Sequence, residues 1–295
     1  MGTEGVTILF QTIINGISNG GVYCLVAVGL TMIVGVLKAV NFSQGDCLTL
    51  GMYLTYVLQR ITGLDPLWLL IPTALVSMLI GMGLFDGIVY PVMGKSKTAF
   101  TITTLGMSFS LSTALLLIFG ANPLTVDSVL KTTTFQIGQF SIAGPRLVSF
   151  LIMAVFVLAL NIFLKKTDMG RAMRATAESA EISQMLGIDT HSVARMTFSL
   201  GIMFAGVAGL LISPTYYLYP STGGAFNILA MCCVVIGGMG NIMGAALGAM
   251  MVGILEAFIG TYISIDLSTG AAFLLLILVL LLKPNGLLGK GERVA

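Results

Sequence analysis

The sequence predicts an all-α fold, a polytopic transmembrane helical bundle, and three observations carry that prediction. Hydrophobic residues make up 57% of the 295 residues and charged residues only 9%, against about 25% charged residues in an ordinary soluble domain. Several charge-free runs reach the ~20 residues that a helix needs to cross a bilayer. These runs lack the alternation of apolar and polar residues that marks barrel strands. We therefore expect about 8–9 spans, some short or broken, in a single transmembrane domain covering residues 1–295.

The spans are expected, in chain order, at residues 7–36, 47–59, 66–90, 98–119, 146–164, 195–213, 226–239, 243–262 and 267–283. The first span is expected to be retained, because the N-terminus MGTEGV lacks the basic region of a cleavable signal peptide. The charge-free run 196–255 must be split, since Pro214, Pro220 and Gly223-Gly224 interrupt it. Two spans, 47–59 and 226–239, are short and supply the broken helices of the bundle.

The basic residues favour one orientation. With the N-terminus outside, three of them lie outside, namely Arg60, Lys131 and Arg146. Eleven lie on the cytoplasmic side: Lys38, Lys95, Lys97, Lys165, Lys166, Arg171, Arg174, Arg195, Lys283, Lys290 and Arg293. Because cytoplasmic loops normally carry the excess of Lys and Arg, this bias predicts an outer N-terminus and a cytoplasmic C-terminus.

Two connections are long. The outer one, residues 120–145, contains Asn122-Pro123 and Pro145 and is expected to be an ordinary connector. The inner one, residues 165–194, is charged and favours a helix from Arg171 to Leu186, rich in good helix formers and ended by Gly187.

The side chains of this inner helix are expected to form stripes. One stripe is charged and comprises Arg171, Arg174, Glu178 and Glu181, with Arg174 and Glu178 spaced to pair. The neighbouring stripes are apolar or small and comprise Ala172, Ala175, Ile182 and Leu186, and Met173, Ala177 and Ala180. Such a helix either docks another protein or packs on its own membrane domain, and the stripes leave both interpretations open.

A polar stretch, VNFSQGD, lies between the first two spans and comprises Asn41, Phe42, Ser43, Gln44, Gly45 and Asp46 after Val40. The charge-free run 5–37 before it would be ~50 Å long as a helix, more than a straight crossing needs. We expect a break in which Asn41 or Ser43 caps a short helix that begins near Cys47. Irregular backbone at membrane depth must face protein or a wet cavity. This break is therefore a candidate for lining the translocation path, with a plain cytoplasmic turn as the alternative.

A second break is expected in the other half of the chain, at Gly237, Gly238, Gly240 and Asn241. Paired broken segments are typical of an inverted repeat with a binding site near mid-membrane, so such a repeat is possible here. The four-residue spacing of Gly240, Gly244 and Gly248 places them on one helix face. That face allows either close packing of a neighbouring helix or passage of a solute along exposed backbone.

Three carboxylates lie near the membrane: Asp46, Asp86 and Glu256. Asp86 is close enough to the inner end of its span to reach the interface. Glu256 lies deeper and is a candidate either for lining the pathway or for pairing with a neighbouring helix. Since it alone is clearly deep, the sequence argues against a proton relay and an ion-coupled carrier.

The residues offer no catalytic or metal-binding set. Gly94-Lys95-Ser96 lacks the first glycine of a phosphate-binding loop, because Val89 occupies that position. His191 is the only histidine and is expected as a solvated loop residue, which disfavours a metal site and a Ser/His protease. The cysteines are expected as small core residues: Cys24, Cys47, Cys232 and Cys233. We therefore expect no enzyme activity, no metal, no cofactor and no nucleic-acid partner.

Four sets of residues carry a family resemblance. Gly170–Ala175, Ala177-Glu178 and Leu186–Ile188 form the first set, in the inner loop. The second set comprises Gly29–Met32, Asn41-Phe42, Gly45-Asp46 and Leu50-Gly51. The third set is Val235–Asn241, and the fourth is Leu282–Gly289. Together, in this order, they resemble the permeases of the high-affinity branched-chain amino acid ABC transporter family. The sequence departs from the family pattern in two places, since Ser43-Gln44 replaces a common Ala-His and Asp46 replaces a usual Glu. The amide of Gln44 cannot be protonated as the imidazole of a histidine can. A role that requires protonation at this position therefore does not carry over from the family.

The resemblance implies a permease subunit of an ATP-driven importer for branched-chain amino acids or a similar small polar solute, in the bacterial inner membrane. It implies as partners a second permease subunit in a homo- or heterodimer, two cytoplasmic ABC ATPase subunits that bind the ATP, an external solute-binding protein and membrane lipid. It assigns ATPase coupling to Arg171, Arg174, Ala177, Glu178, Glu181, Leu186 and Gly187. The resemblance and the interpretation of the individual residues together give the candidates for the translocation pathway, which are Asn41–Asp46, Gly237, Gly238, Gly240, Asn241 and Glu256. A stand-alone secondary carrier for a small polar solute is the alternative.

Overall fold

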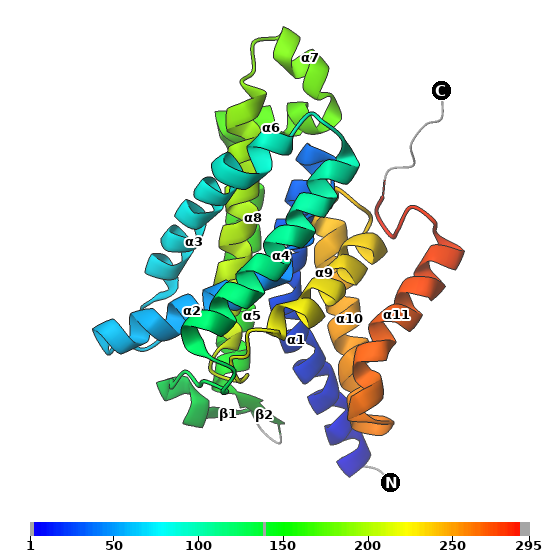
Figure 1. Cartoon of the computed structure of the whole chain (residues 1–295). Coiled ribbons are helices and arrows are strands. Elements are labelled where there is room, and N and C mark those ends of the chain that lie inside the picture. Colours follow the sequence, from blue (N-terminus) through cyan, green and yellow to red (C-terminus); the bar gives the residue numbers. More distant parts are fainter. Residues whose placement is uncertain (1–2, 138–139, 290–295) are drawn as a thin grey trace.

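The computed structural model describes residues 3–137 and 140–289 and is a bundle of apolar helices (Figure 1). Its α-helices are α1 (Thr3–Leu37), α2 (Gln44–Thr62), α3 (Leu70–Leu84), α4 (Lys97–Phe119), α5 (Gly144–Lys166), α6 (Asp168–Glu178), α7 (Ala180–Met185), α8 (Thr190–Ile212), α9 (Thr222–Gly237), α10 (Ile242–Tyr262) and α11 (Ile265–Leu282). A π-helical turn η1 (Phe85–Val89) and the 3₁₀ turns η2 (Tyr90–Val92) and η3 (Val129–Thr132) complete the helical segments.

Each predicted span corresponds to a helix, so the prediction of an all-α transmembrane bundle is confirmed. Among the described residues, six helices are long and apolar enough to cross a membrane: Thr7–Leu37, Leu70–Val92, Thr98–Phe119, Gly144–Lys166, Thr190–Ile212 and Ile242–Tyr262. Thr222–Gly237 and Gly270–Leu282 are shorter apolar helices. The run 196–255 is split where expected, since α8 ends before Pro214 and α9 begins after Pro220.

α1 and α8 form the centre of the bundle. The most apolar windows of these two helices are 83% buried, against 17–33% for the other four helices that can cross. α1 packs along α10 through glycines, because a Cβ on Gly16 would lie 2.6 Å from the Cα of Ile254. Lipid offers no hydrophobic drive for helix association, so close backbone approach at small residues supplies the packing energy.

The outer connector contains more structure than predicted. β1 (Thr134–Ile137) and β2 (Phe140–Ala143) pair antiparallel within it, and η3 precedes them. Leu124 also pairs with Leu218 of the α8–α9 connection through Leu124 N to Leu218 O (3.2 Å) and the reciprocal bond (2.9 Å). The connector is therefore joined to the segment between α8 and α9.

The inner connector contains two helices, so the prediction of one helix from Arg171 to Leu186 is wrong. Ser179 is extended (φ −151°, ψ 114°) and its hydroxyl accepts a hydrogen bond from Ile182 N, which starts α7. A serine at an N-cap satisfies a free amide of the new helix better than it serves a helix interior. The predicted stop is confirmed, because Gly187 has φ 82° and directly follows the last turn.

The C-terminal segment caps α9. Leu287 N donates to Ile236 O (2.8 Å) and Leu288 N donates to Gly237 O (3.0 Å), which satisfies two carbonyls that a helix end leaves free. Two of the segments that carry the family resemblance, Val235–Asn241 and Leu282–Gly289, thus lie against each other. Lys290 and Arg293, expected on the inner side, lie outside the described residues.

Candidate functional site

The polar stretch Asn41–Asp46, called the central break below, lies deep inside the bundle. Gln44 Nε2 donates to the carbonyl oxygen of Gly201 (2.9 Å), and the Ser108 hydroxyl donates to the Asp46 carboxylate. Ser108 is the central residue of α4 and Gly201 that of α8, each helix having 23 residues. At 1.5 Å per residue, both lie about 17 Å from either helix end. This position does not fit a plain cytoplasmic turn.

The side chains of the central break are bonded to one another. Asn41 Oδ1 accepts from Ser43 N (3.1 Å) and from Ser43 Oγ (2.7 Å), while Asn41 Nδ2 donates to Gln44 Oε1 (3.2 Å). All three side chains are fully buried. α2 therefore begins at Gln44, earlier than the predicted Cys47, and Asn41 organises the turn while Ser43, the N-cap residue, makes no side-chain cap bond.

The N-terminal turns of α2 and α9 meet at the central break. Gly45 N donates to Asn227 Oδ1 (3.4 Å), and a Cβ on Gly45 would overlap the carbonyl oxygen of Gly223. A Cβ on Gly223 would lie 2.7 Å from both Cα and Oδ1 of Asp46. Asp46, only 4% exposed, is therefore placed beside the positive ends of two helix dipoles, which favour a carboxylate. Discontinuous helices that meet in this way form solute sites in other transporters.

The second predicted break does not reach this site. Gly237, Gly238, Gly240 and Asn241 lie at the opposite end of α9, and the break that faces Asp46 is the one before Thr222. A Cβ on Gly237 would overlap the backbone of Gly244, and a Cβ on Gly240 would lie 3.6 Å from Gly35 Cα. Asn241 accepts from Gly244 N (3.0 Å) and donates to Leu288 O (2.8 Å). The geometry of these residues therefore supports helix packing and capping.

Glu256 lies in the C-terminal half of α10 and pairs with a neighbouring helix. Tyr23 Oη of α1 donates to Glu256 Oε2 at 2.6 Å. The Tyr23 ring lies 6.1 Å from the ring of Phe226, which lies 6.0 Å from the ring of Tyr216. These three rings, called the aromatic cluster below, adjoin the central break because Phe226 precedes Asn227.

The predicted coupling residues divide between two environments. In α6, Met173 and Thr176 are buried, and a Cβ on Gly170 would overlap the backbone of α5, so this helix packs on its own membrane domain. The α7 segment instead exposes Ile182 (60%), Met185 (85%) and Leu186 (75%). Arg171, Arg174, Glu178, Glu181 and Gly187 are exposed and Ala177 is half-buried.

The charged stripe of α6 forms a different pair from the predicted one. Arg171 pairs with Asp168 one turn earlier, whereas Arg174 and Glu178 form no ion pair among the described residues. Both partners of the Asp168 pair are exposed, so it contributes little to stability.

The N-terminal end of α8 holds the remaining candidates. Asp86 of η1 pairs with Arg195 at 2.8 Å, both side chains being about 40% exposed, so the pair adds little stability. His191 is not a solvated loop residue as predicted, because it lies in the first turn of α8 with its ring centroid 4.3 Å from that of Tyr90. Asp189 caps this helix, and hydrogen bonds from Ser192 lower the pKa of its carboxyl group.

Sequence reasoning missed the partners of the central break, namely Thr104, Ser108, Gly201, Gly223 and Asn227. Ser108 and Asn227 carried a usable signal, since polar side chains inside long apolar runs mark buried polar contacts. The two glycines carried none, because contact through a carbonyl oxygen or a missing Cβ depends on how the helices pack. The four cysteines are buried and free, as predicted, and within residues 3–137 and 140–289 no group of His, Cys, Asp and Glu is placed to hold a metal.

Comparison with known proteins gives a family match. Residues 12–282 match the family described as branched-chain amino acid transport system / permease component. The chain is 31% identical over 304 residues to the high-affinity branched-chain amino acid transport system permease protein LivH of Escherichia coli K12, with 98% of each chain covered. It is 31% identical over 297 residues to the corresponding protein BraD of Pseudomonas aeruginosa, with 96% of each covered. The ribose import permease protein RbsC of Haemophilus influenzae is 26% identical over 254 residues, covering 83% of this chain and 76% of RbsC.

Proposed function

Because the chain belongs to the family of branched-chain amino acid transport system permease components, we propose that it is the membrane subunit of an ATP-driven importer for a branched-chain amino acid or a similar small polar solute. The observation that carries this proposal is the family match over residues 12–282. A second permease subunit, two cytoplasmic ATPase subunits that bind the ATP and an external solute-binding protein complete the proposed importer.

In this importer the central break borders the translocation path. The support is physical, since buried polar side chains and two helix N-termini at mid-span are costly in lipid unless they face protein or a polar path. Asp46 and Ser108 supply polar groups at the level of the middle of α4. The remaining pathway candidates, Gly237, Gly238, Gly240 and Asn241, support α9 from its other end.

The α7 segment docks on the ATPase in this proposal. Three large exposed apolar side chains within residues 182–186 form a compact anchor of the kind that fills a pocket on a partner. Because α6 is packed on α5, movement of α7 would be passed to the membrane helices. In Figure 1, α6 and α7 lie at one end of the bundle and the N-terminal end of α1 at the other, in keeping with an outer N-terminus and a cytoplasmic docking segment.

Reconstitution tests the proposal. The purified chain in liposomes is expected to take up no leucine, whereas the chain assembled with its second permease subunit, ATPase subunits and solute-binding protein takes up leucine only with ATP. Assemblies whose ATPase subunits cannot hydrolyse ATP serve as the control. Uptake by the chain alone would instead establish a stand-alone carrier.

A further inference from the structure

A cavity of about 270 Å³ lies between the aromatic cluster and the outer end of the bundle. It is bordered by α1, the N-terminal turns of α5 and the segment that follows α8. Its polar wall comprises Asn19, Tyr23, Arg146, Ser149, Thr215 and Tyr216. Since one water needs about 10–15 Å³ of such volume, the cavity has room for a small solute together with water.

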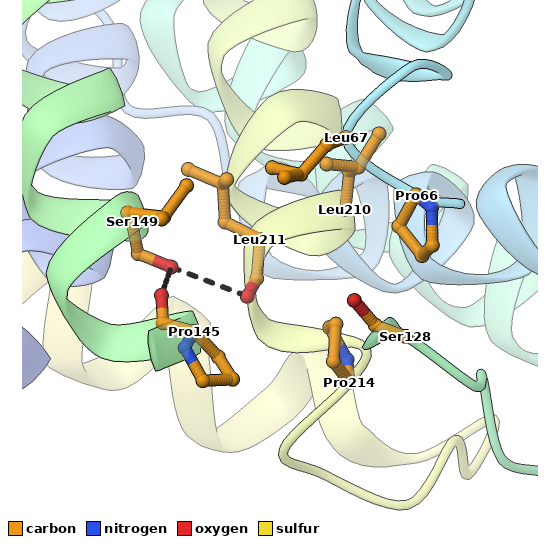
Figure 2. A pocket seen from close by; sticks show the side chains of 9 residues that line it. Pro66, Leu67, Ser128, Pro145, Ser149, Leu210, Leu211 and Pro214 are labelled. Atoms are coloured by element: carbon orange, nitrogen blue, oxygen red, sulfur yellow. Dashed lines mark hydrogen bonds between the residues drawn. The ribbon is translucent and has the colours of Figure 1, made fainter. Parts of the chain in front are cut away.

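The wall of the cavity is held in place by the contact between α5 and α8. Ser149 Oγ donates to the carbonyl oxygen of Pro145 (2.7 Å) and lies 3.4 Å from that of Leu211 (Figure 2). The same three residues border a smaller apolar pocket of about 20 Å³, drawn in Figure 2, which also contacts Pro66 and Pro214. That pocket is too small for a solute. The larger cavity therefore has a preformed wall on the α5 side.

A cation lies on this wall. Arg146 is in the first turn of α5, and its Nη1 donates to Asn15 Oδ1 (2.8 Å), which uses one of the five N–H donors of the guanidinium. A guanidinium binds a carboxylate with two parallel hydrogen bonds, and the nearby N-terminus of α5 favours an anion as well.

A carboxyl group lies behind Tyr23, another residue of the cavity wall. Tyr23 borders the cavity and its hydroxyl is bonded to Glu256. The two charges act on the same ring: burial raises the pKa of Tyr216, the charge of Glu256 raises it further and that of Arg146 lowers it. Arg146 therefore borders the cavity directly, and Glu256 adjoins its wall through Tyr23.

We propose that this cavity binds a small solute that carries both a carboxylate and an ammonium group, with the carboxylate on Arg146 and the ammonium toward Tyr23 and Glu256. The inference rests on the proposed function and adds a solute site on the outer side of the central break, separated from it by the aromatic cluster. An amino acid carries both charges, whereas a sugar or a neutral amide such as urea carries neither, so the site selects among the solutes that such a permease encounters.

Protection of an introduced thiol tests this site. Asn19→Cys places a reporter one helical turn from Asn15, the partner of Arg146, and the four native cysteines are buried. In membranes with the assembled importer, leucine at ten times its dissociation constant is expected to slow modification by a methanethiosulfonate reagent about tenfold. Leucinamide, which lacks the carboxylate, and 3-methylbutanoate, which lacks the ammonium, are expected to protect less than about twofold at that concentration.

Charge-removing variants assign the groups. Arg146→Gln is expected to abolish protection by leucine, and Glu256→Gln to bring leucine and 3-methylbutanoate to the same protection. Arg60→Gln, at an outer arginine that lies over the Tyr56 ring away from the cavity, is the matched control and leaves protection unchanged. Thr215→Cys, an exposed cavity residue, replaces the first reporter if Asn19→Cys does not assemble.

The outcomes separate the two proposals. Equal protection by leucine and leucinamide, or no protection by either in importers that take up leucine with ATP, overturns the cavity site alone. Failure of the unmodified importer to take up leucine with ATP contradicts the proposed function itself.

Discussion

Asp46 shows how single residues adapt to the middle of a membrane bundle. A carboxylate at the bilayer centre costs about 3 kcal/mol on insertion scales. Here the Ser108 hydroxyl donates to it, and the first turns of α2 and α9 surround it. The cost is therefore offset by contacts from three helices that lie far apart in the sequence. Such an arrangement is retained more readily for transport than for stability alone.

Asp46→Asn tests this residue. The amide has the same shape and can still accept from Ser108, so we expect the importer to assemble while ATP-driven uptake falls about tenfold, a loss of about 1.4 kcal/mol. Thr55→Val is the control, for which we expect near-normal uptake. It removes a buried hydrogen bond within α2, from Thr55 Oγ1 to Gly51 O (2.8 Å). Uptake and gel-filtration profile are measured together. If Asp46→Asn prevents assembly and Thr55→Val does not, Asp46 is a structural cap.

At the scale of elements, the contact between α2 and α9 depends on a missing side chain at Gly223. Gly223→Ala is expected to destabilise the chain, because the neighbouring groups are backbone and Asp46, and overpacking of this kind costs about 1–3 kcal/mol. Gly224→Ala is a matched control one residue away, since a Cβ there meets nothing within 4 Å and alanine favours the helix by about 0.5–1 kcal/mol.

Thermal unfolding of the two variants in detergent measures this difference. We expect a lower midpoint for Gly223→Ala and an unchanged or slightly higher one for Gly224→Ala. Equal midpoints would mean that the first turns of α2 and α9 do not touch.

The end of α9 gives a second prediction for helix ends. Asn241 caps α10 and also holds the C-terminal segment through Leu288 O. Asn241→Ser keeps a capping oxygen but is too short to reach Leu288, whereas Asn241→Ala loses both contacts. Relative to Asn241→Ser, we expect Asn241→Ala to lose a further ~1 kcal/mol of stability. Hydrogen exchange of residues 285–289 is expected to rise in both variants, and an unchanged rate would exclude the anchoring role.

The sequence could predict those features of these elements that depend on neighbouring residues, but not those that depend on contacts between distant segments. Hydrophobic run length and the breaks at Pro214 and Pro220 are local, and they placed every span. The helix break at Ser179 was also local, but favourable helix residues on both sides hid the capping signal. The pairing of the central break with the start of α9 was not predictable, because it depends on Gly45 and Gly223, whose contact requires the folded bundle. The local patterns instead indicated a second break at Gly240-Asn241, which lies at the other end of α9.

At the scale of the whole molecule, the polar features lie along one direction. The cavity is bordered by the N-terminal turns of α5, the aromatic cluster adjoins both the cavity and the central break, and α7 lies at the end of the bundle opposite the N-terminal end of α1 (Figure 1). α1 contributes to the cavity through Tyr23 and to the central break through Gly29, since a Cβ on Gly29 would lie 2.9 Å from Gln44 Nε2. A tilt of α1 against α8 would therefore alter the cavity and the central break together.

The exposed end of α7 carries the last prediction. Met185→Glu combined with Leu186→Glu replaces two side chains that are 85% and 75% exposed, so the permease itself is expected to fold normally. Charged side chains would have to be buried on docking, and losing two apolar anchors at an interface centre costs about 2–4 kcal/mol. We therefore expect ATPase association to weaken at least about thirtyfold and uptake to fall with it.

The predicted coupling residues of α6 supply the comparison for that variant. Ala177→Arg with Glu178→Arg adds bulk and charge on the neighbouring helix, at a half-buried and an exposed position, and is also expected to weaken association. Lys165→Glu with Lys166→Glu, at the exposed end of α5, makes a larger change in charge outside the docking segment and is the control. Association is measured by co-purification and by ATP hydrolysis in liposomes. If both docking variants retain the ATPase and full uptake while the control does so too, the partner contacts a different part of the inner face.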